Sequence, residues 1–186
     1  MTVTPKKSIL QLNIYKPNFG ENYKKNPIRL SANENPLGCS PKILNSISFS
    51  DFNKYPPQHS RNLVLAIAKR FNLDKEKIIL SNGSDELISI IAQSFLNVND
   101  EAIYTEYGFL QYPQAIVVAG GKPIIAKDNN LTVSVENIIK QINQKTRLIF
   151  LANPNNPTGT FITKNEILKL LEAMPKNVLL VYDAAY

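Results

Sequence analysis

The sequence has little of several features that would narrow its class at once. Its one cysteine, Cys39, excludes an internal disulfide and favours a reducing compartment. No apolar run approaches the ~20 residues that span a bilayer. Residues 1–19 contain neither a long apolar segment nor a small-residue cleavage site, so we expect no signal peptide. These absences together predict a cytoplasmic protein with no membrane segment.

The sequence also lacks concentrated positive charge, although its formal net charge is +6. Among the lysines only Lys6–Lys7 and Lys24–Lys25 are neighbours, and no arginine cluster or basic stripe interleaved with aromatic residues is present. A solvated surface that attracts anions in general explains this pattern better than nucleic-acid binding does. Neither nucleotide fingerprint, GxGxxG or GxxxxGK[ST], occurs. We therefore expect no nucleic-acid partner, and we assign no metal ligands.

With 44% hydrophobic residues, the chain has the composition of a globular protein. After an irregular start, its apolar pattern predicts strands that alternate with helices. Residues 1–40 are rich in turn formers and charge and are expected to form an arm. In residues 41–186 we expect strands at 77–81, 101–106, 122–127, 146–152 and 177–183, and helices at 60–72, 84–96, 109–121, 134–143 and 163–174. This alternation predicts an α/β domain with a mostly parallel sheet and helices on both faces.

Ligands of open α/β sheets bind beyond the carboxyl ends of the strands, so the segments that follow the expected strands are the candidate site. The segment SNGSDE, residues 81–86, opens a helix. The backbone amides of Ser84, Asp85 and Glu86 are suited to bind an anion such as phosphate. The alternative is an ordinary helix start in which Ser84 caps its own helix.

Two further segments carry polar groups in unusual arrangements. NPNNPTG, residues 153–159, is a rigid loop that leaves Asn153, Asn155 and Asn156 to orient an oxygen of a ligand. In DAAY, Asp183 ends a strand and could keep a ring nitrogen protonated, which makes a pyridine ring an electron sink. The hydroxyl of Tyr186 could then bond a neighbouring ring oxygen. The alternatives are a turn-rich connection and an aspartate that caps a turn.

These segments, in this order, resemble the fold-type I pyridoxal-phosphate aminotransferases, in which NPNNPTG is followed by a helix, a strand and D-x-x-Y. Four more segments are similar to the histidinol-phosphate aminotransferase group: SANENPLGCSPK, NKYPPQHSRNLVLAIAKRF, LSNGSDELI and TEYGFLQYP. The resemblance runs from about Leu30 to Tyr186. It implies transfer of an amino group between histidinol phosphate and 2-oxoglutarate in histidine biosynthesis, with pyridoxal 5′-phosphate as the cofactor.

The resemblance also implies roles for individual residues. The implied cofactor-binding residues are Ser84, Asp85 and Glu86 at the phosphate, Phe109 against the ring, Asn156 and Tyr186 at the phenolic oxygen, Asp183 at the ring nitrogen, and Tyr55 at the phosphate of the neighbouring subunit. Tyr55 therefore implies a homodimer. Asn33 and Asn35 would bind substrate near its entrance.

Two departures from the family pattern affect the expected activity. DAAY has an alanine where the family has glutamate. In the family the chain continues past the tyrosine, and the continuation supplies the lysine that forms the Schiff base, an arginine for the substrate carboxylate and a small C-terminal domain. We therefore expect residues 41–186 to form a partial large domain with no assigned catalytic residue. It would be inactive alone, or completed by a C-terminal chain.

Two other readings of the sequence stay open. One is a non-catalytic remnant that binds phosphate, and the other is an enzyme like threonine-phosphate decarboxylase. His59 and Cys39, which have no evident partners, are expected to be a surface histidine and a small buried side chain.

Overall fold

The structure is a computed structural model that describes residues 5–12, 32–46, 53–55 and 60–186. Its contacts divide the chain into two compact units. Unit 1 comprises Met1–Leu12 and Leu80–Tyr186, and unit 2 comprises Asn13–Ile79. The expected division between an arm and a domain at residue 40 stays a prediction, and His59 lies outside the described residues.

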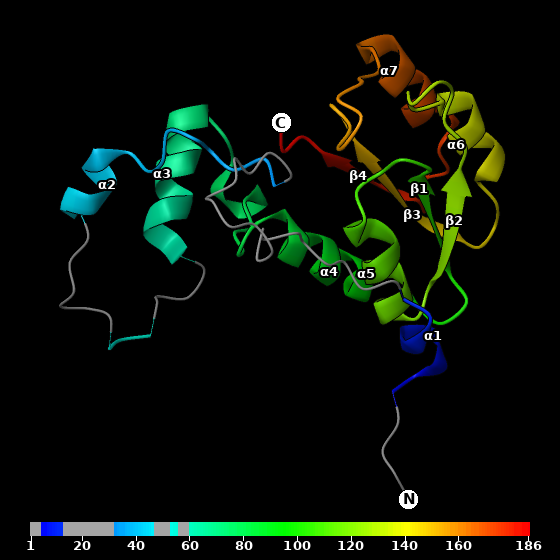
Figure 1. Cartoon of the computed structure of the whole chain (residues 1–186), viewed down its shortest axis with the longest axis horizontal. Coiled ribbons are helices and arrows are strands. Elements are labelled where there is room, and N and C mark those ends of the chain that lie inside the picture. The colour runs from blue at the N-terminus through cyan, green and yellow to red at the C-terminus, as the bar shows by residue number, and fades with distance from the viewer. Residues whose placement is uncertain (1–4, 13–31, 47–52, 56–59) are drawn as a thin grey trace, which may run out of the picture. The chain divides into compact units, whose positions relative to one another are not determined.

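Unit 1 is built on a parallel sheet of four strands in the order β2-β1-β3-β4 (Figure 1). The strands are β1 Glu101–Thr105, β2 Lys122–Ala126, β3 Thr146–Ala152 and β4 Leu179–Asp183. The nearly continuous apolar run of β3 is buried almost throughout, because both faces of an inner parallel strand are covered. The α/β fold with a mostly parallel sheet is confirmed.

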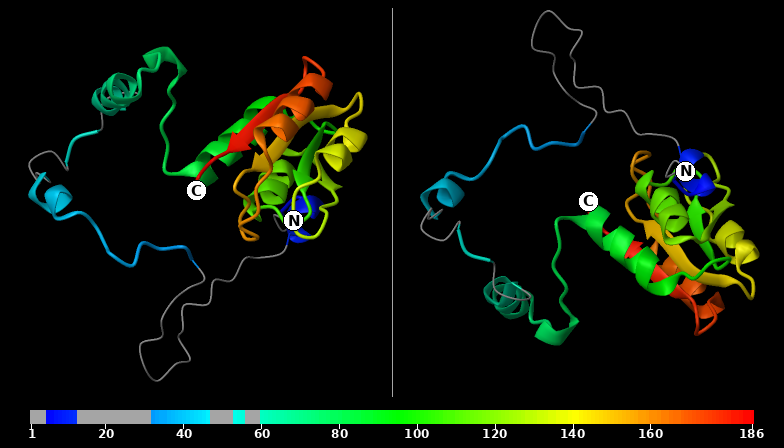
Figure 2. Two further views of the ribbon diagram at one scale, coloured as in Figure 1. Left: turned by 90° about the horizontal axis from the view of Figure 1, so that it is seen from above. Right: turned by 90° about the horizontal axis from the view of Figure 1, so that it is seen from below.

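Helices cover both faces of this sheet, with α4 and α5 on one side and α6 and α7 on the other (Figure 2). Alternate residues of β3 serve the two faces: Phe150 packs in the cluster that includes α4 and α5, and Ile149 packs in the cluster that includes α6 and α7. The helices of unit 1 are α1 Lys7–Leu10, α4 Ser84–Phe95, α5 Gln111–Ala119, α6 Val135–Gln141 and α7 Lys164–Ala173.

The ends of these helices follow local sequence signals. Before α7, the Thr163 hydroxyl accepts a hydrogen bond from the Glu166 amide, and the Glu166 carboxylate accepts one from the Thr163 amide at 2.7 Å. Helix α5 ends at Gly120, whose φ of 96° places it in the left-handed region that glycine tolerates. Both ends therefore form from signals that involve only a few neighbouring residues.

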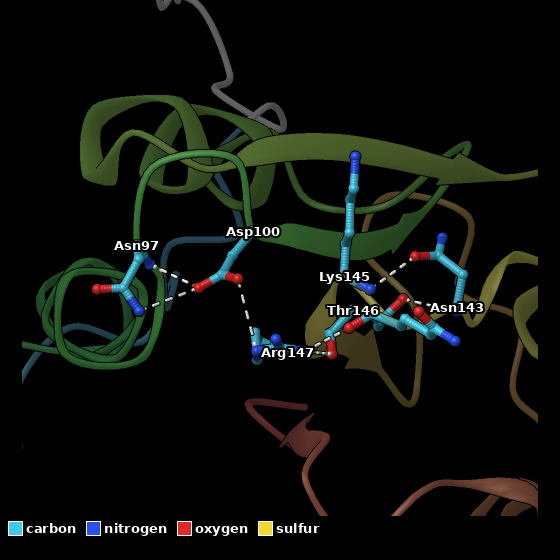
Figure 3. Close-up of polar contacts among 7 residues, drawn as sticks. Asn97, Asp100, Asn143, Lys145, Thr146 and Arg147 are labelled. Carbon is cyan, nitrogen blue, oxygen red and sulfur yellow. Dashed lines mark hydrogen bonds and ion pairs between the residues drawn. The ribbon is translucent and has the colours of Figure 1, made fainter.

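A network of polar side chains lies at the end of the sheet where the strands begin, which we call the amino edge (Figure 3). Strand β3 has one extra residue, Arg147, opposite the Glu101–Ala102 step of β1. The Arg147 Nε lies 3.5 Å from Asp100 Oδ1, and Asp100 Oδ2 accepts a hydrogen bond of 2.8 Å from the Asn97 amide. The amino ends of the two central strands are thereby tied to each other and to the end of α4.

The described part of unit 2 contains α2 Pro41–Ser46, α3 Arg61–Phe71 and the short 3₁₀ helix η3 Lys75–Lys77. The expected helix at 60–72 is confirmed, but the expected strand at 77–81 is wrong. Asp74 Oδ1 accepts a hydrogen bond of 3.0 Å from the Glu76 amide and so starts the 3₁₀ turn. The extended residues that follow pair with no strand in the described part, and Ile79 is 77% exposed.

The expectation of a buried Cys39 is also wrong, because this side chain is exposed. Its described neighbours in residues 32–46 are exposed as well, so they form no core around it. Among the described residues, no helix is long and apolar enough to cross a membrane.

Candidate functional site

The parallel strands of unit 1 deliver their following loops to one edge of the sheet, which we call the carboxyl edge. It holds the loop after β1, the NPNNPTG loop after β3 and the DAAY segment after β4. The start of α4 and the end of the chain after β4 lie on the same side of the unit (Figures 1 and 2). Within unit 1, the sequence-predicted site residues are thus gathered at one edge.

Asp183 is held at this edge through its backbone and through both carboxylate oxygens. Its backbone carbonyl accepts a hydrogen bond of 2.9 Å from the Asn153 amide. Oδ2 accepts one of 2.8 Å from the Tyr112 hydroxyl, and Oδ1 accepts one of 3.2 Å from the Ala185 amide. The carboxylate therefore does cap a turn, as one reading of the sequence suggested. An ionised carboxylate has about four acceptor sites, so it can still accept a ring N–H.

Tyr112 lies beside Asp183 in the candidate site and was not among the residues predicted from the sequence. It is completely buried, its ring stacks on Phe150 with centroids 5.2 Å apart, and the ring of Phe109 meets it edge-on at 5.9 Å. Burial, and then the hydrogen bond to Asp183, raise the pKa of Tyr112 well above its ordinary value, so its hydroxyl stays protonated and donates. The signal for it was a tyrosine in an apolar helix, which needs a polar partner when it is buried.

The position of Phe109 depends on a tight turn before it, in which Gly108 lies close to Thr105. A Cβ on Gly108 would lie 2.7 Å from Oγ1 and 3.0 Å from the carbonyl oxygen of Thr105, so only glycine fits without movement. The Gly108 amide donates a hydrogen bond of 2.9 Å to that carbonyl. This turn places Phe109 directly before α5, where its ring is partly buried against the core.

The three asparagines of the NPNNPTG loop do different things. Asn153 bonds Ile162 through both side-chain atoms, at 2.8 and 3.2 Å, and so closes the loop on itself. Asn155 is 2% exposed and donates to the Tyr107 carbonyl at 3.1 Å. Asn156 remains partly exposed, and its Nδ2 lies 3.4 Å from the Tyr186 hydroxyl. The expectation that all three would orient a ligand is wrong for the two buried ones, which serve the loop.

The start of α4 leaves backbone donors available for an anion. Gly83, with φ of 84°, occupies the N-cap position, so Ser84 is the first helical residue and does not cap its own helix. The Glu86 carboxylate turns back and accepts hydrogen bonds from Asn82 N at 2.6 Å and Nδ2 at 3.0 Å. The amides of Ser84 and Asp85 belong to the first turn, where an α-helix offers no internal acceptor, and no described residue accepts from them.

A short chain of hydrogen bonds ties this helix start to the aromatic residues. Ser89 Oγ donates to the Asp85 carbonyl at 3.0 Å and accepts from Gln111 Nε2 at 3.1 Å. Because Gln111 opens α5, the first turn of α4 is linked to the helix that carries Tyr112. Seven of the predicted residues therefore share unit 1: Ser84, Asp85, Glu86, Phe109, Asn156, Asp183 and Tyr186.

Three further predicted residues, Tyr55, Asn33 and Asn35, belong to unit 2. Tyr55 is fully exposed. Asn35 closes a tight turn, since its Oδ1 accepts from the Leu37 amide at 3.0 Å and its Nδ2 donates to the Gly38 carbonyl at 3.1 Å. The backbone of Asn33 has a positive φ of 52°. Their roles at the cofactor and the substrate stay predictions.

The chain is similar to known proteins in sequence and in fold. Two similar curated proteins are histidinol-phosphate aminotransferases: that of Pelagibacter ubique (strain HTCC1062) is 42% identical over all of this chain and 52% of its own length, and that of Rhodopseudomonas palustris (strain BisA53) is 46% identical over 85% of this chain and 44% of its own. The chain spans about half the length of the curated relatives it matches.

A similar solved structure is histidinol-phosphate aminotransferase from Sinorhizobium meliloti in complex with pyridoxal-5′-phosphate. Its TM-score is 0.88 at 22% identity, over all of this chain and 52% of that one, which supports the fold. The family model for aminotransferase class I and II matches residues 25–186. Since this match covers most of the sequence, the chain belongs to the class I and II aminotransferase family.

Proposed function

We propose that this chain carries the cofactor-binding half of a pyridoxal-phosphate enzyme that moves an amino group between histidinol phosphate and 2-oxoglutarate. The observation that supports it most is the carboxyl edge of unit 1. There a strand-end carboxylate, a nearby aromatic ring and a helix start with available amides share one network of contacts. The substrate rests on similarity to histidinol-phosphate aminotransferases.

The residues at this edge fit the polar groups of pyridoxal phosphate one by one. The Asp183 carboxylate has acceptor sites left for a protonated ring nitrogen. Asn156 Nδ2 and the Tyr186 hydroxyl, 3.4 Å apart, can serve the same phenolic oxygen. The amides at the start of α4 suit a phosphate, because the helix dipole favours an anion at that terminus.

Pyridoxal phosphate, when bound, supplies an electron sink for the carbon that loses or gains the amino group. Asp183 would hold a proton on the ring nitrogen, and Phe109 would cover one face of the ring and exclude water from it. The first turn of α4 would anchor the phosphate. Each of these groups binds or orients, and none of them is placed to move a proton at the substrate carbon.

The lysine expected for that proton transfer belongs to the half of the family's length that this chain does not span. We propose that activity needs this half, supplied by the same polypeptide or by another chain. The proposal includes a cytoplasmic homodimer in which Tyr55 reaches the neighbouring subunit's cofactor. Net charge of +6 is in keeping with substrates and a cofactor that are anionic.

A binding experiment tests the first part of the proposal. Purified chain mixed with pyridoxal phosphate is expected to shift the absorbance of the cofactor, and Asp183→Ala should abolish the shift. Borohydride should then leave no stoichiometric adduct on any one lysine. Such an adduct would contradict the claim that the chain lacks the covalent lysine. Binding of inorganic phosphate with no change in cofactor absorbance would favour a phosphate-binding remnant.

A complementation experiment tests the second part. The chain is co-expressed with the C-terminal half of the Pelagibacter ubique relative, and glutamate formation from histidinol phosphate and 2-oxoglutarate is measured. We expect activity only in the presence of both halves, and loss of that activity in Asp183→Ala. Release of CO2 from threonine phosphate, without glutamate formation, would instead favour an enzyme like threonine-phosphate decarboxylase.

A further inference from the structure

Tyr112 makes contacts with two of the groups proposed to hold the cofactor ring. Its hydroxyl donates to Asp183 Oδ2 at 2.8 Å, and the ring of Phe109 meets its ring at 5.9 Å with an angle of 86° between their planes. The ring of Tyr112 is itself held, because it is completely buried and stacks on Phe150 of the central strand β3 at 13°. One side chain thus fixes a carboxylate and an aromatic ring relative to the sheet.

The hydrogen bond from Tyr112 contributes to the orientation of the Asp183 carboxylate. Asp183 Oδ1 accepts from the Ala185 amide of its own segment, while Oδ2 accepts from Tyr112 on α5. Two donors from different elements leave the carboxylate little freedom to rotate about its Cβ–Cγ bond. A carboxylate that is already oriented can receive a ring N–H without first losing rotational freedom, which favours binding.

The chemistry of the donor also matters. A lysine or arginine in this place would neutralise the carboxylate, whereas a tyrosine hydroxyl is a neutral donor and leaves the negative charge intact. Burial raises the pKa of Tyr112, with a further contribution from Asp183, so the hydroxyl keeps its proton at neutral and moderately alkaline pH. The charge of Asp183 then remains available for a protonated ring nitrogen.

We infer that Tyr112 is a positioning residue for the pyridine ring: it aims the Asp183 carboxylate at the ring nitrogen and sets the orientation of the Phe109 ring. This inference rests on the proposed function, since it needs a pyridine ring at the carboxyl edge. In this role Tyr112 does not contact the reacting atoms. Its influence passes through the two residues that touch the ring.

The test uses pyridoxamine 5′-phosphate, a probe that needs no lysine to bind. Its affinity is measured by titration calorimetry for the whole chain and for Tyr112→Phe, which keeps the ring and removes the hydroxyl. A matched control is Tyr104→Phe, because Tyr104 is a partly buried tyrosine packed against the same core cluster. We expect binding to weaken about tenfold in Tyr112→Phe, the equivalent of about 1.4 kcal/mol, and to change less than about twofold in the control.

A second readout separates positioning from general loosening of the fold. With ¹⁵N-labelled probe, the NMR shift of the ring nitrogen is followed across pH. In Tyr112→Phe the nitrogen is expected to lose its proton at a lower pH than in the unchanged chain. In an Asp183→Asn background, Tyr112→Phe should weaken binding no further, because its effect acts through that carboxylate.

The possible failures are distinguishable. Equal affinity and an unchanged nitrogen titration in Tyr112→Phe would overturn the inference and leave the proposed function standing. No binding to the unchanged chain would overturn both. If Tyr112→Phe is unfolded at the assay temperature, the Tyr112 hydroxyl proton is observed by NMR in the unchanged chain instead. A resonance that does not move when the probe saturates the chain would then overturn the inference.

Discussion

The two edges of the sheet in unit 1 use their polar groups in opposite ways. At the amino edge, Glu101 is 7% exposed, and its two oxygens accept from Asn143 at 2.8 Å and Lys122 at 3.4 Å. At the carboxyl edge, Asp183 has acceptor sites left after its two bonds, and the first amides of α4 have no acceptor among the described residues. The polar groups of the amino edge bond to one another, whereas those of the carboxyl edge have donors and acceptors left for a ligand.

This contrast separates polar residues that stabilise the fold from polar residues that could bind something. Ser84 and Asp85 are exposed and Asp183 is half-buried, so water can use their remaining hydrogen-bonding capacity until a ligand takes its place. In an open parallel sheet the carboxyl edge is also where ligands bind. Variants at the two edges are therefore expected to divide into those that change stability and those that change affinity for the cofactor.

The largest effect is expected in the core directly beneath the carboxyl edge. Phe150→Ala should lower the free energy of unfolding by about 3–5 kcal/mol, because it leaves a cavity in the central strand. It should also weaken binding of pyridoxamine phosphate, since Tyr112 loses the ring on which it stacks. Urea unfolding and calorimetry measure the two quantities.

Ile149→Ala is the control for that variant, because Ile149 is equally buried but packs on the opposite face of β3. It should cost about 2–5 kcal/mol of stability and leave the affinity of the folded protein unchanged. Equal losses of affinity in both variants would show that binding follows overall stability rather than the Tyr112 contact.

The sequence was sufficient to predict most of unit 1. Alternation of apolar runs predicted four of its strands, and the helices expected at 109–121 and 163–174 formed close to those bounds, because these signals depend on a few neighbouring residues. The strand expected at 77–81 did not form, since strand character alone does not provide a pairing partner. The capping turn at Asp74 starts a 3₁₀ helix over Lys75–Lys77, and residues 78–81 after it belong to no helix or strand.

The sequence predicted which segments form the candidate site, but it predicted less well which side chains in those segments could face a ligand. Composition marked the NPNNPTG loop, yet nothing in it distinguishes an asparagine that turns inward from one that faces the site. That difference arises from tertiary contacts, such as the bond from Asn155 to the Tyr107 carbonyl across 48 residues of chain. Tyr112 was missed for the same reason, because its partner Asp183 lies 71 residues away.

An intermediate effect is expected within the NPNNPTG loop, where adjacent asparagines have different surroundings. Asn155→Ala should lower the free energy of unfolding by about 1–3 kcal/mol, because it leaves the Tyr107 carbonyl and Thr158 without their donor. Asn156→Ala should change stability by less than about 0.5 kcal/mol, since it is partly exposed and makes one long hydrogen bond.

Asn156→Ala should have the larger effect of the two variants when cofactor binding is measured instead of stability. Asn156→Ala is expected to weaken the affinity for pyridoxamine phosphate, whereas folded Asn155→Ala should keep it. Both variants are compared by urea unfolding and by calorimetry at a temperature where each is folded. A loss of affinity in Asn155→Ala with none in Asn156→Ala would show that Asn155, and not Asn156, contacts the ligand.

The smallest effect concerns the amino edge and depends on pH. The hydrogen bond from Asn143 is the main cause that lowers the pKa of Glu101 below 4.5, and burial acts in the opposite direction. A carboxylate whose folded pKa is below its unfolded value stabilises the protein above the unfolded pKa, and this stability is lost as pH falls through the folded pKa. Glu101→Gln should therefore be less stable than the unchanged chain at pH 7, by on the order of 1 kcal/mol.

That difference should shrink as pH falls below 4.5 and through the lower folded pKa of Glu101, where this carboxylate in the unchanged chain takes up a proton. Other carboxylates titrate in the same range but are common to both proteins, so the difference between their unfolding free energies isolates Glu101. Affinity for pyridoxamine phosphate should be the same in both, because Glu101 opens β1 at the opposite edge from Asp183. A difference in stability that stays constant with pH would mean that the charge of Glu101 contributes nothing to the amino edge, and that shape alone holds its network together.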